Sequence, residues 1–133
     1  MKQKVLIIDD EADIRSIVED ILTDEGFEVE TAVDAKSGYT SCETFQPDVI
    51  LLDIWMPAAN GTPSEEGLKL LKEWAAENKL TVPVIMISGH SNVETAVEAV
   101  KIGAYDFLEK RLSTAKLLLT CLLYTSPSPR DRG

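Results

Sequence analysis

Two patterns of hydrophobic residues alternate along the chain. Short apolar runs near residues 5–8, 49–52, 82–87 and 105–108 are typical of buried strands, and the alternation over 27–31 is typical of a half-buried or edge strand. Helical spacing of apolar residues predicts helices near 14–25, 35–45, 64–74 and 93–102, with a last one from about 113. Five strands that alternate with helices predict an α/β fold with a parallel sheet and helices on both faces.

Turn and cap signals divide these elements. Gly26 is predicted to end the first helix and Asp34 to cap the second. Residues 54–66, rich in proline, glycine and asparagine, are predicted to form a loop. Residues 91–94 resemble a capping box, and the helix that they start is expected to bury one apolar stripe, namely Val93, Ala96, Val97 and Val100.

Composition restricts the possible functions. The chain has 133 residues, which fits one domain, and a formal net charge of −10. The acidity lies in residues 1–110, which argues against direct nucleic-acid binding by this chain. No apolar run approaches a membrane span, and the N-terminus lacks the pattern of a secretory signal. Cys42 and Cys121 show no metal-ligand spacing, so we expect free or packed thiols in the reducing cytoplasm.

Polar residues follow the predicted strands where each strand ends. Asp9 and Asp10 follow the first strand, Asp53 the third, Ser88 the fourth and Lys110 the fifth. Carboxyl ends of parallel strands share one edge, where doubly wound folds bind ligands. Two carboxylates ~4 Å apart repel by about 4 kcal/mol at an effective dielectric constant of about 20, so a cation is needed, and oxygen ligands suit Mg²⁺. Such a site also suits a phosphoryl group, which an Asp can accept as a nucleophile.

Four segments carry a resemblance to a known family. They are Asp9-Asp10, Asp53-Ile54-Trp55-Met56-Pro57, Ser88-Gly89-His90 and Gly103-Ala104-Tyr105-Asp106-Phe107-Leu108-Glu109-Lys110. In this order and spacing, over about residues 3–120, they resemble the receiver domain of two-component response regulators, most like the receivers of nitrogen-regulation (NtrX/NtrC-type) activators. The resemblance implies a doubly wound, flavodoxin-like sheet of five parallel strands in the order 2-1-3-4-5.

The resemblance also implies a metal site. Asp53 would be the phosphoacceptor. Asp10, Asp53 and the backbone carbonyl of Trp55 would ligate Mg²⁺ directly, and Asp9 would act mostly through water.

Further roles follow from the same resemblance. Ser88 and Lys110 would contact the phosphoryl group, and Phe107 would stand at the aromatic switch position together with Ser88. A plain core aromatic is an equally good interpretation of Phe107. His90 is interpreted as a loop histidine without a catalytic role, because it is the chain's single histidine and has no relay partner.

The leading hypothesis is a phosphorelay switch in the cytoplasm. A sensor histidine kinase would phosphorylate Asp53, and the face around the fourth helix and fifth strand would respond. That face, with the fifth helix, could hold a dimer partner, and the native readout would be transcriptional. The domain would not be a turnover enzyme, with at most slow self-dephosphorylation. The alternative is a Mg²⁺-dependent aspartyl-phosphate phosphatase, although Trp55 stands where such enzymes prefer an acid. A flavin module of this topology would need a Ser/Thr/Gly-rich loop after the first strand, where acids stand instead.

Three features depart from the family pattern. The loop over 58–66, before Gly67, is long. Arg111 replaces the usual proline after Lys110, which predicts a trans 110–111 bond, or else a strained one, and a less well aimed Lys110. Residues 121–133 lose the helical period and look non-native or disordered, so we expect the receiver domain to cover residues 1–120.

Overall fold

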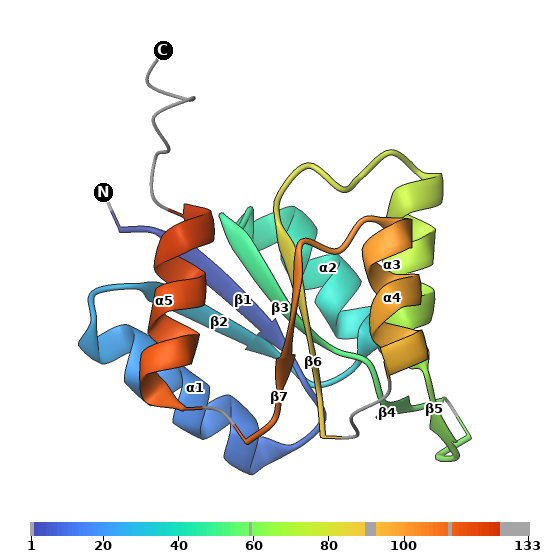
Figure 1. Cartoon of the computed structure of the whole chain (residues 1–133), viewed down its shortest axis with the longest axis horizontal. Helices are drawn as coiled ribbons and strands as arrows, with labels where there is room; N and C mark the ends of the chain where they lie inside the picture. The colour runs from blue at the N-terminus through green and yellow to red at the C-terminus, as the bar shows by residue number, and fades with distance from the viewer. Residues whose placement is uncertain (1, 59, 90–92, 112, 126–133) are drawn as a thin grey trace.

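The main sheet has five parallel strands (Figure 1). The structure is a computed structural model and describes residues 2–58, 60–89, 93–111 and 113–125. The strand order is β2-β1-β3-β6-β7, which confirms the predicted doubly wound topology. The strands are β1 (Lys4–Ile8), β2 (Glu28–Ala32), β3 (Val49–Asp53), β6 (Val84–Ser88) and β7 (Asp106–Glu109).

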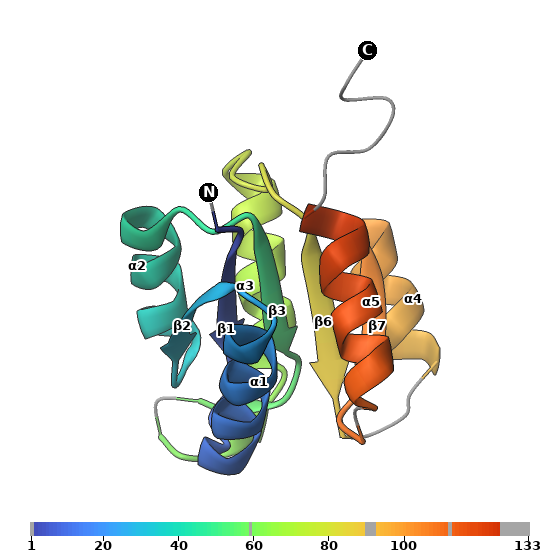
Figure 2. The same ribbon diagram turned by 90° about the vertical axis from the view of Figure 1, so that its left-hand side faces the viewer.

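Helices cover both faces of this sheet. In Figure 2, α1 (Ala12–Asp24) and α5 (Thr114–Thr125) lie in front of the sheet, and α3 (Glu66–Ala76) and α4 (Val93–Ile102) lie behind it, on the side that α2 (Ala35–Phe45) also covers. Consecutive side chains of a central strand therefore point to opposite faces of the sheet and pack in different hydrophobic cores. Leu6 packs with the α3 side and Val5 with the α1 side. Burial on both faces explains why the central strands are apolar without alternation.

Local signals at two helix ends are confirmed. Asp34 accepts a hydrogen bond from the Ser37 backbone N–H at 2.8 Å and forms a capping box with that residue. Gly26 follows α1 with φ +93°, a conformation that glycine adopts without the steric cost of a Cβ atom.

The predicted buried stripe of α4 is wrong. Val93, Val97 and Val100 are 77%, 46% and 53% exposed, and α4 instead buries Thr95 and Ala99. Thr95 and Ala99 are four positions apart, so they lie on one side of the helix and form its narrow buried stripe. Apolar periodicity does not show which stripe faces the core. Ser91 and Asn92, on which the predicted capping box rests, lie outside the described residues.

The region predicted as the 54–66 loop contains a short hairpin. Strands β4 (Met56–Pro57) and β5 (Pro63–Ser64) pair antiparallel, with Met56 buried at the base. Strands of two residues that each contain proline fall below what an apolar pattern detects. Because Ser64 pairs in the hairpin, α3 begins at Glu66 and not at residue 64.

The last helix also differs from its prediction. Helix α5 continues to Thr125, and Cys121 is fully buried in the core on the α1 side. Cys121 follows buried Leu117 by four positions and so continues the buried stripe. Residues 126–133 lie outside the described residues, and the non-native character of 121–133 stays a prediction. Within the described ranges, no helix is both long and apolar enough to span a membrane.

Candidate functional site at the strand carboxyl ends

Four polar residues predicted for the site lie at one edge of the sheet. Asp9 directly follows β1, Asp53 and Ser88 are the last residues of β3 and β6, and Lys110 directly follows β7. The parallel register pairs Asp53 with Ile87 and Ser88 with Glu109, so the strands end at nearly the same level. The sheet itself therefore brings together residues that lie up to 101 positions apart.

Three carboxylates form the centre of the site. Oxygen atoms of Asp9, Asp10 and Asp53 all lie within 4.8 Å of one another. Asp9 and Asp53 are fully buried, and Asp10 is exposed. The predicted cluster is thus present, with two acids inside the protein and one at its rim.

Lys110 supplies the positive charge. Its Nζ lies 3.0 Å from Asp53 Oδ2 and 3.2 Å from Asp9 Oδ2, and its backbone N–H donates to the Ser88 carbonyl at 2.9 Å. No cis peptide bond occurs among the described residues, which confirms the trans bond before Arg111. With that trans bond, the ammonium group of Lys110 still reaches both buried acids.

Burial and mutual repulsion dominate the titration of this cluster. Burial first, and then the charge of Asp9, raises the pKa of Asp53 to about 7, although Lys110 and the Trp55 backbone oppose the rise. Burial also raises the pKa of Asp9. For Lys110, burial disfavours the charged form, but Asp53, Asp9 and Glu11 together outweigh it and raise the pKa of its ammonium group. The site therefore keeps its lysine charged while its two buried acids, Asp9 and Asp53, resist ionisation.

The backbone around Asp53 leaves no space beside it. The Ile54 N–H donates to the Ile87 carbonyl, and the Gly67 N–H donates to the Ile54 carbonyl, both at 3.0 Å. A Cβ atom at Gly67 would lie 1.7 Å from the Asp53 carbonyl oxygen. The first turn of α3 therefore packs directly on the backbone of Asp53, and only glycine allows this approach. The sequence analysis placed Gly67 after the long loop but did not identify this role.

Glu11, the N-cap residue of α1, and Arg15, within α1, also contact the site. The sequence analysis identified neither residue. The Glu11 N–H donates to Asp9 Oδ1 at 2.8 Å, and Arg15 Nη1 donates to the Asp9 carbonyl at 2.8 Å. Glu11 Oε1 lies 3.1 Å from Lys110 Nζ. The one available signal was a Glu at a helix start, where Ser, Thr, Asp or Asn is preferred.

Comparison with protein families identifies the domain. A family model described as response regulator receiver domain matches residues 5–121. The chain belongs to this receiver family. The resemblance carried by the four sequence segments is thereby confirmed.

Relatives of this receiver domain are longer regulators. It is 44% identical over 119 residues to the nitrogen assimilation regulatory protein NtrX of Azorhizobium caulinodans, covering 90% of this chain and 25% of that protein. It is 34% identical over 116 residues to the regulatory protein AtoC of Escherichia coli, covering 87% of this chain and 24% of that protein. The chain thus spans about a quarter of the length of these curated relatives.

A solved structure agrees with the fold. The receiver domain of NtrX from Brucella abortus superposes with a TM-score of 0.81 at 42% identity, covering 93% of this chain and 99% of that one. This receiver domain is therefore related to NtrX-type regulators in both sequence and structure.

The acid cluster of the receiver domain fits a hard cation. Its donors are carboxylate oxygens, which Mg²⁺ prefers. Asp9 Oδ2 is buried and makes no hydrogen bond to any described residue, although Lys110 Nζ lies nearby. A buried carboxylate oxygen that accepts no hydrogen bond and lies beside two further carboxylates fits a position near a metal ion.

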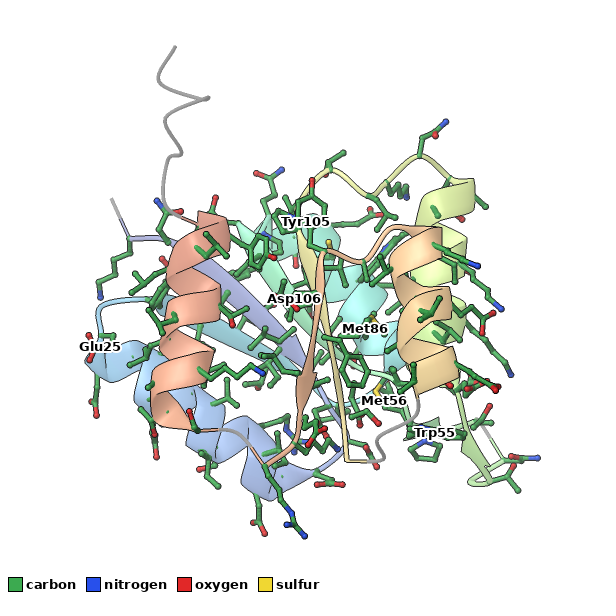
Figure 3. All side chains as sticks on the ribbon, in the orientation of Figure 1. Glu25, Trp55, Met56, Met86, Tyr105 and Asp106 are labelled. Carbon is green, nitrogen blue, oxygen red and sulfur yellow. The ribbon has the colours of Figure 1, made fainter. Side chains whose placement is uncertain are left out.

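The remaining predicted residues lie around this centre. Ser88 is buried at the end of β6. Phe107 is half-buried, pairs with Met86 in the sheet and lines an apolar hollow of about 580 Å³ beside α4. Figure 3 shows Trp55 at the edge of the molecule where the strands end, and its backbone N–H donates to Asp53 Oδ1 at 3.3 Å. His90 lies outside the described residues.

Proposed function

We propose that this domain is a phosphoacceptor switch that takes a phosphoryl group from a sensor histidine kinase onto Asp53. The observation that supports this most directly is the buried Asp53 carboxylate with a second buried acid and a lysine in contact. A buried acid cluster lowers stability, and a protein keeps such a feature when it serves a site. The family of the chain agrees with this interpretation.

Mg²⁺ is the proposed cofactor. Asp10, Asp53 and the Trp55 backbone carbonyl would hold it directly, and Asp9 would hold it through water. When bound, the ion supplies positive charge to phosphoryl oxygens and offsets the repulsion among the acids. The proposal is supported by the oxygen atoms of the three acids, which lie within 4.8 Å of one another.

The proposed transfer needs an ionised Asp53. A carboxylate oxygen of Asp53 forms a bond to phosphorus while the bond from phosphorus to the kinase imidazole nitrogen breaks, and that nitrogen keeps the electron pair. Lys110, 3.0 Å from Asp53, is placed to donate to the phosphoryl oxygens, and the Ser88 hydroxyl would donate beside it.

The proposed output is a change on the face of α4 and β7. Ser88 and Lys110 belong to β6 and the end of β7, so new contacts there act directly on this face. Phe107 lies on β7 beneath the exposed valines of α4, where a steric switch together with Ser88 would act. This face, with α5, is also the proposed site of a dimer partner. The relatives are regulators, so we infer a transcriptional readout in a longer protein. The cytoplasmic location stays a prediction.

The test is phosphorylation by a small phosphodonor. The protein is incubated with phosphoramidate and Mg²⁺, and intact mass is measured for the wild type, Asp53→Asn and the control Asp20→Asn, which removes an exposed α1 acid. We expect one acid-labile phosphoryl group per chain in the wild type and the control, and none in Asp53→Asn. Many turnovers of phosphate release per chain would instead support the phosphatase alternative, and absence of any adduct would refute the proposal.

A further inference from the structure

The ammonium group of Lys110 is shared among three carboxylates. Its Nζ lies 3.0 Å from Asp53 Oδ2, 3.2 Å from Asp9 Oδ2 and 3.1 Å from Glu11 Oε1. Asp9 and Asp53 are buried, whereas the Glu11 side chain is 56% exposed. Lys110 donates hydrogen bonds to Asp9 Oδ1 at 3.3 Å and to Asp53 Oδ2 at 3.0 Å, and Glu11 adds an ion pair from the solvent side.

Glu11 departs from the preference of its position. It is the N-cap residue of α1, and its carbonyl accepts the Arg15 N–H at 3.1 Å, yet its side chain makes no capping hydrogen bond. Short polar side chains are favoured at an N-cap because they satisfy free backbone donors of the first turn. The Glu11 carboxylate instead extends to Lys110, while its N–H is fixed to Asp9 Oδ1. A local rule broken beside a functional site indicates a function for the residue.

We propose that Glu11 is a positioning residue that holds Lys110 in the unphosphorylated domain and must release it when Asp53 carries a phosphoryl group. This inference rests on the proposed function. A phosphoryl group on Asp53 brings further negative charge to the Lys110 ammonium, so its oxygens compete with the present partners of Lys110 for the same N–H donors. Glu11 is the partner that gives way most easily, because water can solvate its half-exposed carboxylate whereas Asp9 is buried. Glu11 therefore opposes the phosphorylated state.

The first test measures affinity for a phosphoryl mimic. Beryllofluoride is titrated in saturating Mg²⁺ with tryptophan fluorescence as the signal, because Trp55 lies beside Asp53. The variants are Glu11→Gln, which removes the charge, and Glu11→Asp, which keeps the charge but shortens the reach to Lys110. Asp13→Asn is the matched control, since Asp13 is an exposed acid in the first turn of α1.

We expect both Glu11 variants to bind beryllofluoride about 2–5-fold more tightly than the wild type, the range of a half-exposed ion pair, and the control to bind equally. Tightening in Glu11→Gln alone, or an equal effect in Asp13→Asn, would show a through-space charge effect and overturn the inference. A wild type that binds no beryllofluoride would refute the proposed function itself, which is a distinguishable result.

The second test uses the metal-free protein and needs no phosphorylation. Lysine is labelled with ¹⁵N, and the exchange of the Lys110 ammonium protons with water is measured by NMR. We expect faster exchange in both Glu11 variants, because one hydrogen-bond partner is lost, and no change in Asp13→Asn. Unchanged exchange in the Glu11 variants would mean that Glu11 does not hold Lys110 and would overturn the inference.

Discussion

Replacing Asp53 by asparagine should stabilise the metal-free protein at high pH. The folded-state pKa of Asp53 is about 7, against its ordinary value of 3.8. Well below pH 3.8 the acid is protonated in both the folded and unfolded states, so the raised pKa has little effect. As the pH rises from 4 to 7 the unfolded chain ionises while the folded chain keeps its proton, and stability is lost. Above pH 7 the loss is complete.

The magnitude follows from the two pKa values. The difference between about 7 and 3.8 corresponds to about 4 kcal/mol, at about 1.36 kcal/mol for each pH unit. The same linkage leaves about 1.7 kcal/mol at pH 5. The geometry supports this scale, since charges separated by the 4.8 Å limit of the cluster repel by about 3.5 kcal/mol at an effective dielectric constant of about 20. Asparagine has nearly the same shape and no charge, so the variant avoids this cost.

Urea unfolding of the wild type, Asp53→Asn and the exposed-acid control Asp20→Asn tests this, at pH 8 and pH 5, with and without Mg²⁺. We expect Asp53→Asn to gain about 4 kcal/mol at pH 8, less than half of that at pH 5, and a smaller margin in Mg²⁺, which stabilises only the intact cluster. Asp20→Asn should follow the wild type throughout. The reasoning is wrong if the gain of Asp53→Asn is absent at pH 8, or is as large at pH 5.

Two further substitutions test the packing and charge of the site. Lys110→Met leaves two buried carboxylates without a cation, so we expect the free energy of unfolding at pH 8 to fall by about 3 kcal/mol, and by less at lower pH, where the acids are protonated. The control Lys79→Met, at the surface, should change urea unfolding little. Equal losses in the two variants would contradict this reasoning. Gly67→Ala places a Cβ atom 1.7 Å from the Asp53 carbonyl oxygen, so we expect the free energy of unfolding to fall by about 1–3 kcal/mol and phosphorylation by phosphoramidate to slow. The control Gly89→Ala, whose Cβ would meet only ordinary contacts, should keep the stability and the phosphorylation rate of the wild type. A Gly67→Ala variant that behaves like the wild type would show that α3 can move aside without cost.

The convergence of Asp9, Asp53 and Lys110 could be predicted from the sequence. It needed only the assignment of buried strands and the rule that parallel strands end at one edge. The same reasoning could not find the Glu11 contact with Lys110 or the packing of Gly67 on Asp53. Both depend on where a helix start lies relative to a distant strand, which no local period records.

The error in α4 has a different cause. Its valines have the spacing of a core-facing stripe, and periodicity cannot distinguish a stripe that faces the sheet from one that faces solvent. The buried positions, Thr95 and Ala99, are small and carry a weak hydrophobic signal. The buried stripe of α4 was therefore the less conspicuous one in the sequence.

The position of Lys110 along the chain affects how the domain forms during synthesis. Asp9 and Asp53 lie in the first half of the chain, while the lysine that neutralises them lies 101 residues after Asp9 and 57 after Asp53. A nascent chain that joined β1 to β3 early would bury two acids without a cation. We therefore expect ribosome-bound intermediates to keep this pair of strands apart near neutral pH, so that folding waits until nearly the whole domain has emerged.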